Sequence, residues 1–296
     1  MIAAAAVLLG VLAQSGAVPT LAPSYVPQRV YDTNQHAFSD FESMLGDLAR
    51  ADIIFVGEQH DDPNTHRLEL AILEGLHRRN VPVAVSLEMF ERDTQGALDQ
   101  FLTGSTSEDV FLKGARPWPR YATDYRPLVD FAKANGWPVI AANVPRRHAT
   151  DVAKRGLEAV DQLSLSERPH AAREFECPRD VYFDKFAAAM AEHPAPGTEK
   201  MTVDEQRTRT GRYYESQCVK DETMAESIAA VTGRQVVHFN GAFHSDFGLG
   251  TAERTRRRLP RRRLVVVSIL PVADLNALAP SGDDLKRADY LVYTIK

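Results

Sequence analysis

The sequence lacks several residues and motifs on which common enzyme classes depend. Its 296 residues include only two cysteines and two tryptophans. The patterns that it does not contain are G-x-S-x-G, G-x-x-x-x-G-K-[ST], H-E-x-x-H and, after any predicted strand, G-x-G-x-x-G. Acyl transfer by a serine elbow, nucleotide hydrolysis at a P-loop and dinucleotide binding therefore have no support in the sequence.

An excess of positive charge is also missing. The formal net charge is -5, so the chain has no basic footprint for nucleic acid, and we expect no nucleic-acid partner. One basic cluster, at residues 254–263, contains seven arginines. Such clusters are most often solvated helix ends. A patch that binds phosphate, propionate or anionic lipid is the alternative.

Beyond the first residues, the chain has no apolar segment long enough to cross a membrane. Residues 2–13 are apolar apart from Gly10, and small residues follow at Ser15, Gly16 and Ala17. This pattern is typical of a signal peptide, so we predict one at residues 1–17 and export to the periplasm or the exterior. A buried N-terminal helix is the alternative. No cysteine follows the apolar run, so a lipid anchor is not supported.

The two cysteines are Cys177 and Cys218, and neither belongs to a C-x-x-C pair. Metal binding by the pair is therefore not expected. In an oxidising compartment an even pair favours a disulfide, which we predict here. Two buried free thiols are the alternative.

Strand-like and helix-like segments alternate along the chain. Short apolar runs bounded by polar residues are typical of strands buried on both faces of a parallel sheet. The sequence therefore predicts an α/β fold, with a mostly parallel central sheet and helices on both faces. We expect an extended lead-in at residues 18–40 and one domain at 41–296, with a helical insertion or cap at about 150–231. The predicted strands are residues 52–56, 81–87, 137–142, 234–239, 264–269 and 290–295, the last at an edge of the sheet.

Polar side chains follow four of the predicted strands. In open parallel sheets, ligands bind beyond the carboxyl ends of the strands, so these side chains should converge. In chain order they are Glu58 and His60, then Glu88, then Asn143 and Arg146, then Asn240 and His244.

Two of these strands end in Gly-x-x-His turns, at residues 57–60 and 241–244. A glycine at a strand end permits a sharp turn and a close approach of a ligand. Carboxylates and neutral imidazoles together suit zinc, manganese, iron or cobalt. They equally suit a metal-free acid–base pair. We therefore predict Glu58, His60, Glu88 and His244 as catalytic or metal-binding residues.

Structural roles remain open for the same residues. His60 could be only a hydrogen-bonded turn residue, and Glu88 only a partner in a structural ion pair. His66 could reach the site or lie on the surface. His238, within a predicted strand, is more typical of a core histidine. The long excursion at residues 104–125 is typical of a lid or binding loop.

Five blocks of the sequence resemble the ChaN-like haem-binding proteins. This family belongs to a wider group with the Tiki and TraB metalloproteases and the erythromycin esterases. The blocks lie in the expected order and cover most of the chain. They are I-I-F-V-G-E-Q-H-D-D-P-N-T-H (53–66), V-S-L-E-M-F (85–90), P-V-I-A-A-N-V-P-R (138–146), D-E-T-M-A (221–225) and H-F-N-G-A-F-H-S-D-F-G (238–248).

The resemblance implies an exported protein of iron or haem uptake, which in that family is often a lipoprotein. It implies haem held between two subunits by tyrosine, so the expected partners are haem or iron, a second copy of the chain and a membrane protein of the uptake system. No motif selects the tyrosine. The candidate haem-binding residues are Tyr121, Tyr125, Tyr213 and Tyr214, with Arg146 near the propionates.

The Tiki-like relatives imply a different function. They carry two Gly-x-x-His motifs and a glutamate in a metal-dependent hydrolytic site, and Glu58, His60, Glu88 and His244 fall on that pattern. Two hypotheses therefore stand: a haem- or iron-binding uptake protein, and a metal-dependent peptidase or esterase. A scaffold that binds partners without chemistry is a third.

Overall fold

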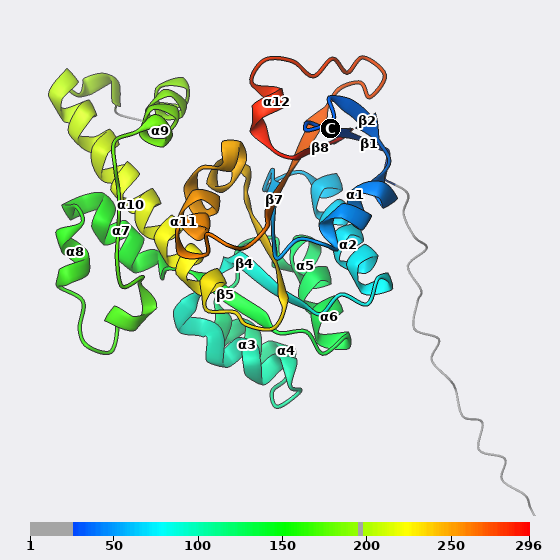
Figure 1. The fold of residues 1–296 in the computed structure, drawn as a ribbon. Coiled ribbons are helices and arrows are strands. Elements are labelled where there is room, and N and C mark those ends of the chain that lie inside the picture. The colour runs from blue at the N-terminus through cyan, green and yellow to red at the C-terminus, as the bar shows by residue number, and fades with distance from the viewer. Residues whose placement is uncertain (1–25, 195–197) are drawn as a thin grey trace, which may run out of the picture.

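The computed structural model describes residues 26–194 and 198–296. The predicted signal peptide and the first part of the predicted lead-in lie outside the described residues. An eight-stranded sheet occupies the centre, in the order β2-β1-β8-β7-β3-β6-β4-β5 (Figure 1). The strands are β1 (Gln28–Asp32), β2 (Ala37–Ser39), β3 (Ile53–Glu58), β4 (Val83–Glu91), β5 (Val139–Asn143), β6 (Gln235–Gly241), β7 (Leu264–Val272) and β8 (Tyr290–Ile295).

Neighbouring strands run parallel from β8 to β5, and β1 and β2 are antiparallel additions. The expected edge position of the last strand is wrong, because β1 pairs with β8 along its whole length. The lead-in thus supplies two strands that shield the backbone of β8. Such cover protects a sheet edge from pairing with other chains.

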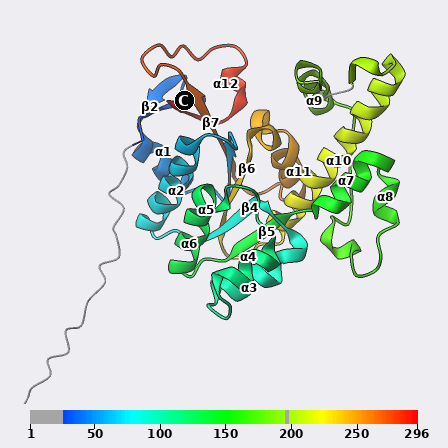
Figure 2. The same cartoon turned by 180° about the vertical axis from the view of Figure 1, so that it is seen from behind.

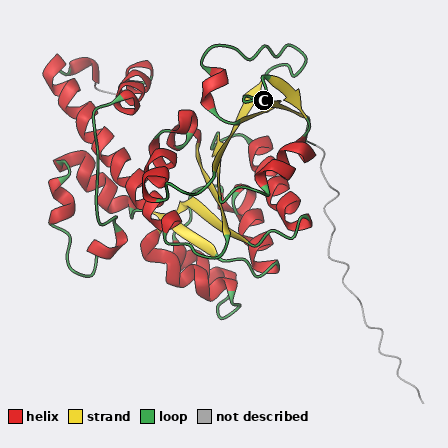
Figure 3. Ribbon diagram, viewed as in Figure 1, coloured by secondary structure: helices red, strands yellow, loops and turns green. Residues whose placement is uncertain are grey.

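Helices surround the sheet, as Figure 3 shows by colour. They are α1 (Phe41–Leu48), α2 (Pro63–Arg78), α3 (Gln95–Leu102), α4 (Glu108–Ala115), α5 (Tyr121–Asp124), α6 (Arg126–Ala134), α7 (Arg146–Arg155), α8 (Glu158–Asp161), α9 (Val181–Glu192), α10 (Val203–Ala229), α11 (Gly250–Arg258) and α12 (Asp284–Arg287). The excursion at 104–125 is therefore largely helical, as α4 and α5.

Alternate residues of β3 point to opposite faces of the sheet. Ile54 and Val56 belong to a core cluster that includes buried side chains of α1, α2 and α6. Ile53 and Phe55 belong to a second cluster, with side chains of α10 and α11. Helices therefore cover both faces, and the predicted α/β class is confirmed.

The predicted cap, at about 150–231, includes most of α7 and all of α8, α9 and α10. These helices lie to one side of the sheet, away from β1 and β2, as the views from both sides show (Figures 1 and 2). The division of the chain into a lead-in, one domain and a cap stays a prediction. A disulfide joins Cys177 to Cys218 of α10, as predicted. Within the described ranges, no helix combines the length and the apolar character that crossing a membrane requires.

Candidate functional site

The two Gly-x-x-His turns lie side by side and each leaves room for the other. Their strands, β3 and β6, are neighbours, with Glu58 opposite Gly241 in the register. A Cβ atom on Gly241 would lie 2.7 Å from Nε2 of His60. A Cβ atom on Gly57 would lie 3.0 Å from the Cα atom of Ala242. Both glycines therefore accommodate a close approach across the pair of strands, and neither has a positive φ.

Glu58 holds the first histidine. Its Oε1 atom lies 2.5 Å from Nδ1 of His60 and accepts a hydrogen bond of 2.8 Å from the hydroxyl of Tyr125. Burial alone would raise the pKa of Glu58, but hydrogen bonds with His60 and Glu69 bring that pKa below its usual value. Burial would lower the pKa of His60, and the bond to Glu58 raises it instead. The pair therefore favours an ionised carboxylate beside an imidazole.

The second histidine lies between two carboxylates. His244 is within 2.6 Å of Asp221 through Nδ1 and within 3.3 Å of Glu88 through Nε2. Burial opposes a charge here, but Glu88 and Asp221 raise the pKa of His244 to about 10. Burial likewise opposes a charge on Glu88, yet the cation of His244 holds the pKa of that carboxyl far below its usual value. His244 is therefore an imidazolium at neutral pH.

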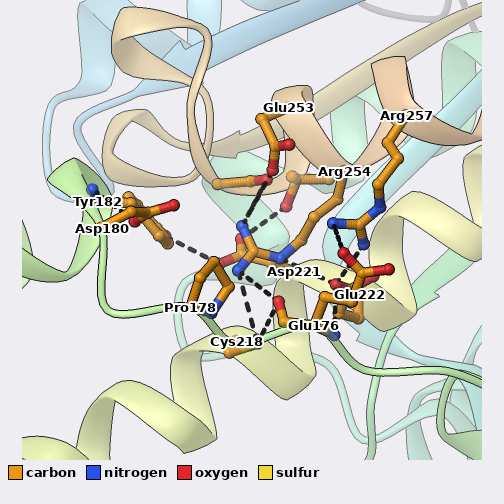
Figure 4. A network of polar contacts seen from close by, with 12 residues as sticks. Glu176, Pro178, Asp180, Tyr182, Cys218, Asp221, Glu222, Glu253, Arg254 and Arg257 are labelled. Carbon is orange, nitrogen blue, oxygen red and sulfur yellow. Dashed lines mark hydrogen bonds and ion pairs between the residues drawn. The ribbon is translucent and has the colours of Figure 1, made fainter. Parts of the chain in front are cut away.

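Asp221 was not predicted as a site residue, although it begins one of the five blocks. It lies on α10, where spacing in the sequence does not reveal that it faces β6. Hydroxyls of Thr251 and Tyr182 each donate a hydrogen bond of 2.8 Å to its carboxylate. Figure 4 shows Asp221 beside Tyr182 and the buried Arg254. These contacts fix the carboxylate that orients His244.

Most of the basic cluster is exposed, as expected of a solvated helix end, but its first arginine is buried. Arg254 is 2% exposed, and its Nε lies 3.3 Å from Glu222 (Figure 4). Arg257 and Arg258 each place a guanidinium nitrogen 2.6 Å from the same buried carboxylate. The first half of the cluster therefore stabilises the junction of α10 and α11, because a buried carboxylate requires such partners.

A cavity of about 400 Å³ opens beside both histidines. Its strand-end walls include Glu58, His60, Gly241 and His244. Its outer walls come from α9, from the segment after β6 and from α12, through Tyr182, Lys185, Phe243, Phe247 and Arg287. The two predicted turns thus border one space.

Glu88 and the two asparagines shape this edge of the sheet. Glu88 lies within β4, not after it, because the strand continues past a register shift to Glu91. Its Oε2 atom accepts the backbone N–H of Gly241 at 2.8 Å. Asn143 donates to the carbonyl of Glu88, and Asn240 donates to the hydroxyl of Ser245. Both asparagines therefore hold backbone and turn geometry.

The four predicted metal ligands form two separate pairs. In the part of the chain that the structure describes, the one group of three ligand atoms within 4.8 Å of one another is Glu58, His66 and Glu69. His66 is 4% exposed, which removes the surface alternative. Glu69 was not predicted, because its place on α2 gives no local indication. An ion site formed by Glu58, His60, Glu88 and His244 stays a prediction.

The candidate haem residues occupy different environments. The hydroxyls of three of them are enclosed by protein. Tyr121 packs among aromatic rings. Tyr125 donates a hydrogen bond to Glu58, and Tyr214 donates one to the backbone carbonyl of Pro178. Tyr213 is 41% exposed.

Arg146 is exposed at the first residue of α7. Its guanidinium lies 5.9 Å from the ring centroid of Trp118, which in turn contacts His60. His238 is a buried core histidine, as predicted, with Nδ1 2.8 Å from the hydroxyl of Ser86.

The sequence matches a family model over residues 44–255, more than half of the chain. The description of that family is haem-binding uptake, Tiki superfamily, ChaN. The protein therefore belongs to the ChaN family of haem-binding uptake proteins, and the resemblance of the five blocks is confirmed.

Two known proteins are similar to this chain. ChaN of Campylobacter jejuni, in a structure described as showing cofacial haem binding, superposes with a TM-score of 0.66 at 17% identity, covering 91% of this chain and 97% of that one. This likeness shows the fold. RETICULATA-RELATED 5, a chloroplastic protein of Arabidopsis thaliana, is 26% identical over 91% of this chain. The chain spans 38% of that protein's length.

Proposed function

We propose that this protein binds haem and serves in haem or iron uptake as an exported protein, in the periplasm or outside the cell. The family match carries this proposal, and the haem-bound state of the Campylobacter jejuni protein supports it. The disulfide supports export, because such bonds persist mainly in oxidising compartments. The chloroplastic relative makes the compartment a part of the proposal that needs its own test.

We assign Tyr213 as the haem ligand. Its ring is exposed on α10, whereas the hydroxyls of Tyr121, Tyr125 and Tyr214 are enclosed by protein. The guanidinium of Arg209 lies 5.3 Å from the centroid of the Tyr213 ring. A phenol for the iron and a guanidinium for a propionate are a donor set that fits haem. A second copy of the chain would cover the outer face, and a membrane protein of the uptake system would receive the cargo.

A haemin titration followed by absorption spectroscopy tests this proposal. The wild-type protein should give a shifted Soret band that saturates. Tyr213→Phe should weaken binding by at least tenfold, which corresponds to about 1.4 kcal/mol. Tyr214→Phe is the matched control, because its hydroxyl is buried one residue away, and it should bind as the wild type does. An unshifted wild-type spectrum contradicts haem binding, and full affinity in Tyr213→Phe contradicts the choice of ligand.

Hydrolysis of an ester or amide bond is a second candidate function. The observation that favours it is the pair of carboxylate-held histidines at one cavity. Nδ1 of His60 is hydrogen-bonded to Glu58. Nε2 of His60 then faces Gly241 and is placed to act as a general base. His244, with both nitrogens bonded to carboxylates, forms the adjoining wall of the cavity. A carboxylate beside each histidine is an arrangement that suits acid–base chemistry.

Turnover of a panel of chromogenic esters and peptide amides tests this second candidate. His60→Gln should lower the rate by about 100-fold or more, in line with loss of a general base. His36→Gln, at an exposed turn, is the control and should leave the rate unchanged. Absence of turnover in the wild type, or equal rates in the two variants, contradicts hydrolysis at His60.

A further inference from the structure

Three buried side chains meet behind the strand-end cavity, and neither proposed function uses them together. They are Glu58 at the end of β3 and His66 and Glu69 on the first turns of α2, with one ligand atom from each lying within 4.8 Å of the others. The two glutamate side chains have no exposed surface, and the His66 side chain is 3% exposed. Helix α2 presents both of its residues on one face, because they are three positions apart.

Both glutamates point an oxygen without an N–H or O–H donor into this cluster. The Oε1 atom of Glu58 bonds to His60 and Tyr125, whereas its Oε2 atom has no N–H or O–H donor and the carboxyl group of Glu69 lies beside it. Glu69 directs Oε2 at Nδ1 of His66, and its Oε1 atom has no partner. Two buried carboxyl groups side by side are costly unless they share a proton or a cation.

The tautomer of His66 points to the same conclusion. Its Nε2 atom lies 3.2 Å from the backbone carbonyl of His60 and 3.5 Å from a carboxylate oxygen of Asp124. Both of these groups accept hydrogen bonds, so the tautomer with its proton on Nε2 satisfies them. In that tautomer Nδ1 presents a lone pair to Glu69 at 3.0 Å and to Glu58 at 3.8 Å, where a cation can bind. Three lone-pair donors thus converge.

We propose that Glu58, His66 and Glu69 bind a divalent transition-metal ion. One imidazole and two carboxylates suit manganese, iron or zinc. An ion bonded at about 2.1 Å to each ligand holds the ligand atoms about 3–4 Å apart, close to the separations at His66. The contacts of Nε2 with a carbonyl, and of Oε1 of Glu58 with Tyr125, are the outer partners that orient metal ligands.

This site differs from the one that the sequence predicts, with which it shares only Glu58. His244 cannot serve as a ligand while both of its nitrogens bond to carboxylates. The proposed site does not depend on haem binding, since it uses none of the candidate haem residues as ligands.

Titration of the chelator-treated, desalted protein with Mn²⁺ tests the site. Electron paramagnetic resonance reports the free ion, and added Zn²⁺ tests competition. The wild type should remove one equivalent of free Mn²⁺. Loss of an outer partner alone costs about 10–100-fold in metal affinity, so Glu69→Gln, which removes a ligand, should cost about 100-fold or more. Glu74→Gln makes the same change at an exposed position of α2 and should bind as the wild type does.

A second variant guards against a folding defect. His66→Asn should lose Mn²⁺ binding, and Mn²⁺ should raise the thermal midpoint of the wild type but not of this variant. Failure of the wild type to bind Mn²⁺ or Zn²⁺ overturns the proposal and leaves a cluster that shares protons. Equal binding by Glu69→Gln and Glu74→Gln also overturns it. Loss of binding in His244→Gln with retention in Glu69→Gln would assign the ion to the strand-end pairs instead. The haemin titration is separate from all these outcomes.

Discussion

Two buried histidines on or beside β6 differ in charge because their partners differ. Both are enclosed, so burial opposes a proton on each. His244 has a carboxylate at each nitrogen, which raises its pKa to about 10. Among the described residues, the hydroxyl of Ser86 is the hydrogen-bond partner of His238, and burial lowers the pKa of His238 to about 3. Nearest partners thus decide which buried imidazole carries charge.

The neutral His238 should make the protein sensitive to acid. Its pKa is about 3 in the folded state against an ordinary value of 6.5, so the unfolded chain gains a proton first as pH falls. The stability that depends on a neutral His238 is fully present above pH 6.5. It is lost as the pH falls from 6.5 toward 3, because only the unfolded chain binds a proton at this residue in that range. At pH 5 the loss should be about 2 kcal/mol, at 1.36 kcal/mol per pH unit.

Urea unfolding of wild type and His238→Asn at pH 7.5 and pH 5 measures this loss. Asparagine retains a group that can bond to Ser86 but does not titrate. The variant should lose about 2 kcal/mol less than the wild type between the two pH values. His36→Asn is the control, because residue 36 is exposed and has a positive φ that asparagine tolerates. Equal acid sensitivity in all three proteins would show that His238 is not the titrating group.

The turns that follow the neighbouring strands β3 and β6 pack against each other. The two glycines have unequal neighbours. A Cβ atom on Gly57 meets backbone at 3.0 Å, which cannot move without the strand, whereas one on Gly241 meets the end of the His60 side chain at 2.7 Å. His60 is 45% exposed and can turn away.

Alanine substitutions should therefore differ in their cost. Gly57→Ala should lower the free energy of unfolding by about 1–3 kcal/mol, because it overpacks a rigid contact. Gly241→Ala should cost less than about 1 kcal/mol and displace His60 from Glu58. Gly96→Ala, inside α3 with open space around it, is the control and should stabilise by up to about 1 kcal/mol. A larger cost at Gly241 than at Gly57 would contradict the described packing.

The sequence predicts the strand ends better than it predicts what faces them. Apolar runs and their order imply a parallel sheet, and the sheet brings Glu58, Glu88 and His244 to one edge. Asp221 and Glu69 lie on helices, and which helical face meets the sheet depends on packing that the local pattern does not encode. The sequence also does not predict that β1 pairs with β8, because the two strands lie near opposite ends of the chain and such distant pairing leaves no local pattern.

At the scale of the whole molecule, one covalent bond ties the segment before α9 to α10. Cys177 and Cys218 are 41 positions apart in the chain. The loop that they close includes α9, whose Tyr182 holds Asp221 beside His244. The disulfide therefore stabilises the outer wall of the cavity as well as the fold.

Removal of the disulfide should destabilise the protein markedly. A closed loop of this length should contribute about 4 kcal/mol through the entropy of the unfolded chain. Urea unfolding of the double variant Cys177→Ala, Cys218→Ala should show a loss of this order, and reduction of the wild type should reproduce it. A loss below about 1 kcal/mol would show that the bond does not constrain the unfolded chain.

The location of iron in the haem-loaded protein tests the central claim most directly. Crystals grown with haemin should give an anomalous iron peak at the iron absorption edge. We expect a peak within bonding distance of the hydroxyl oxygen of Tyr213. A peak at His60 or His244, or no ordered iron at Tyr213 in crystals that retain haem, would contradict it.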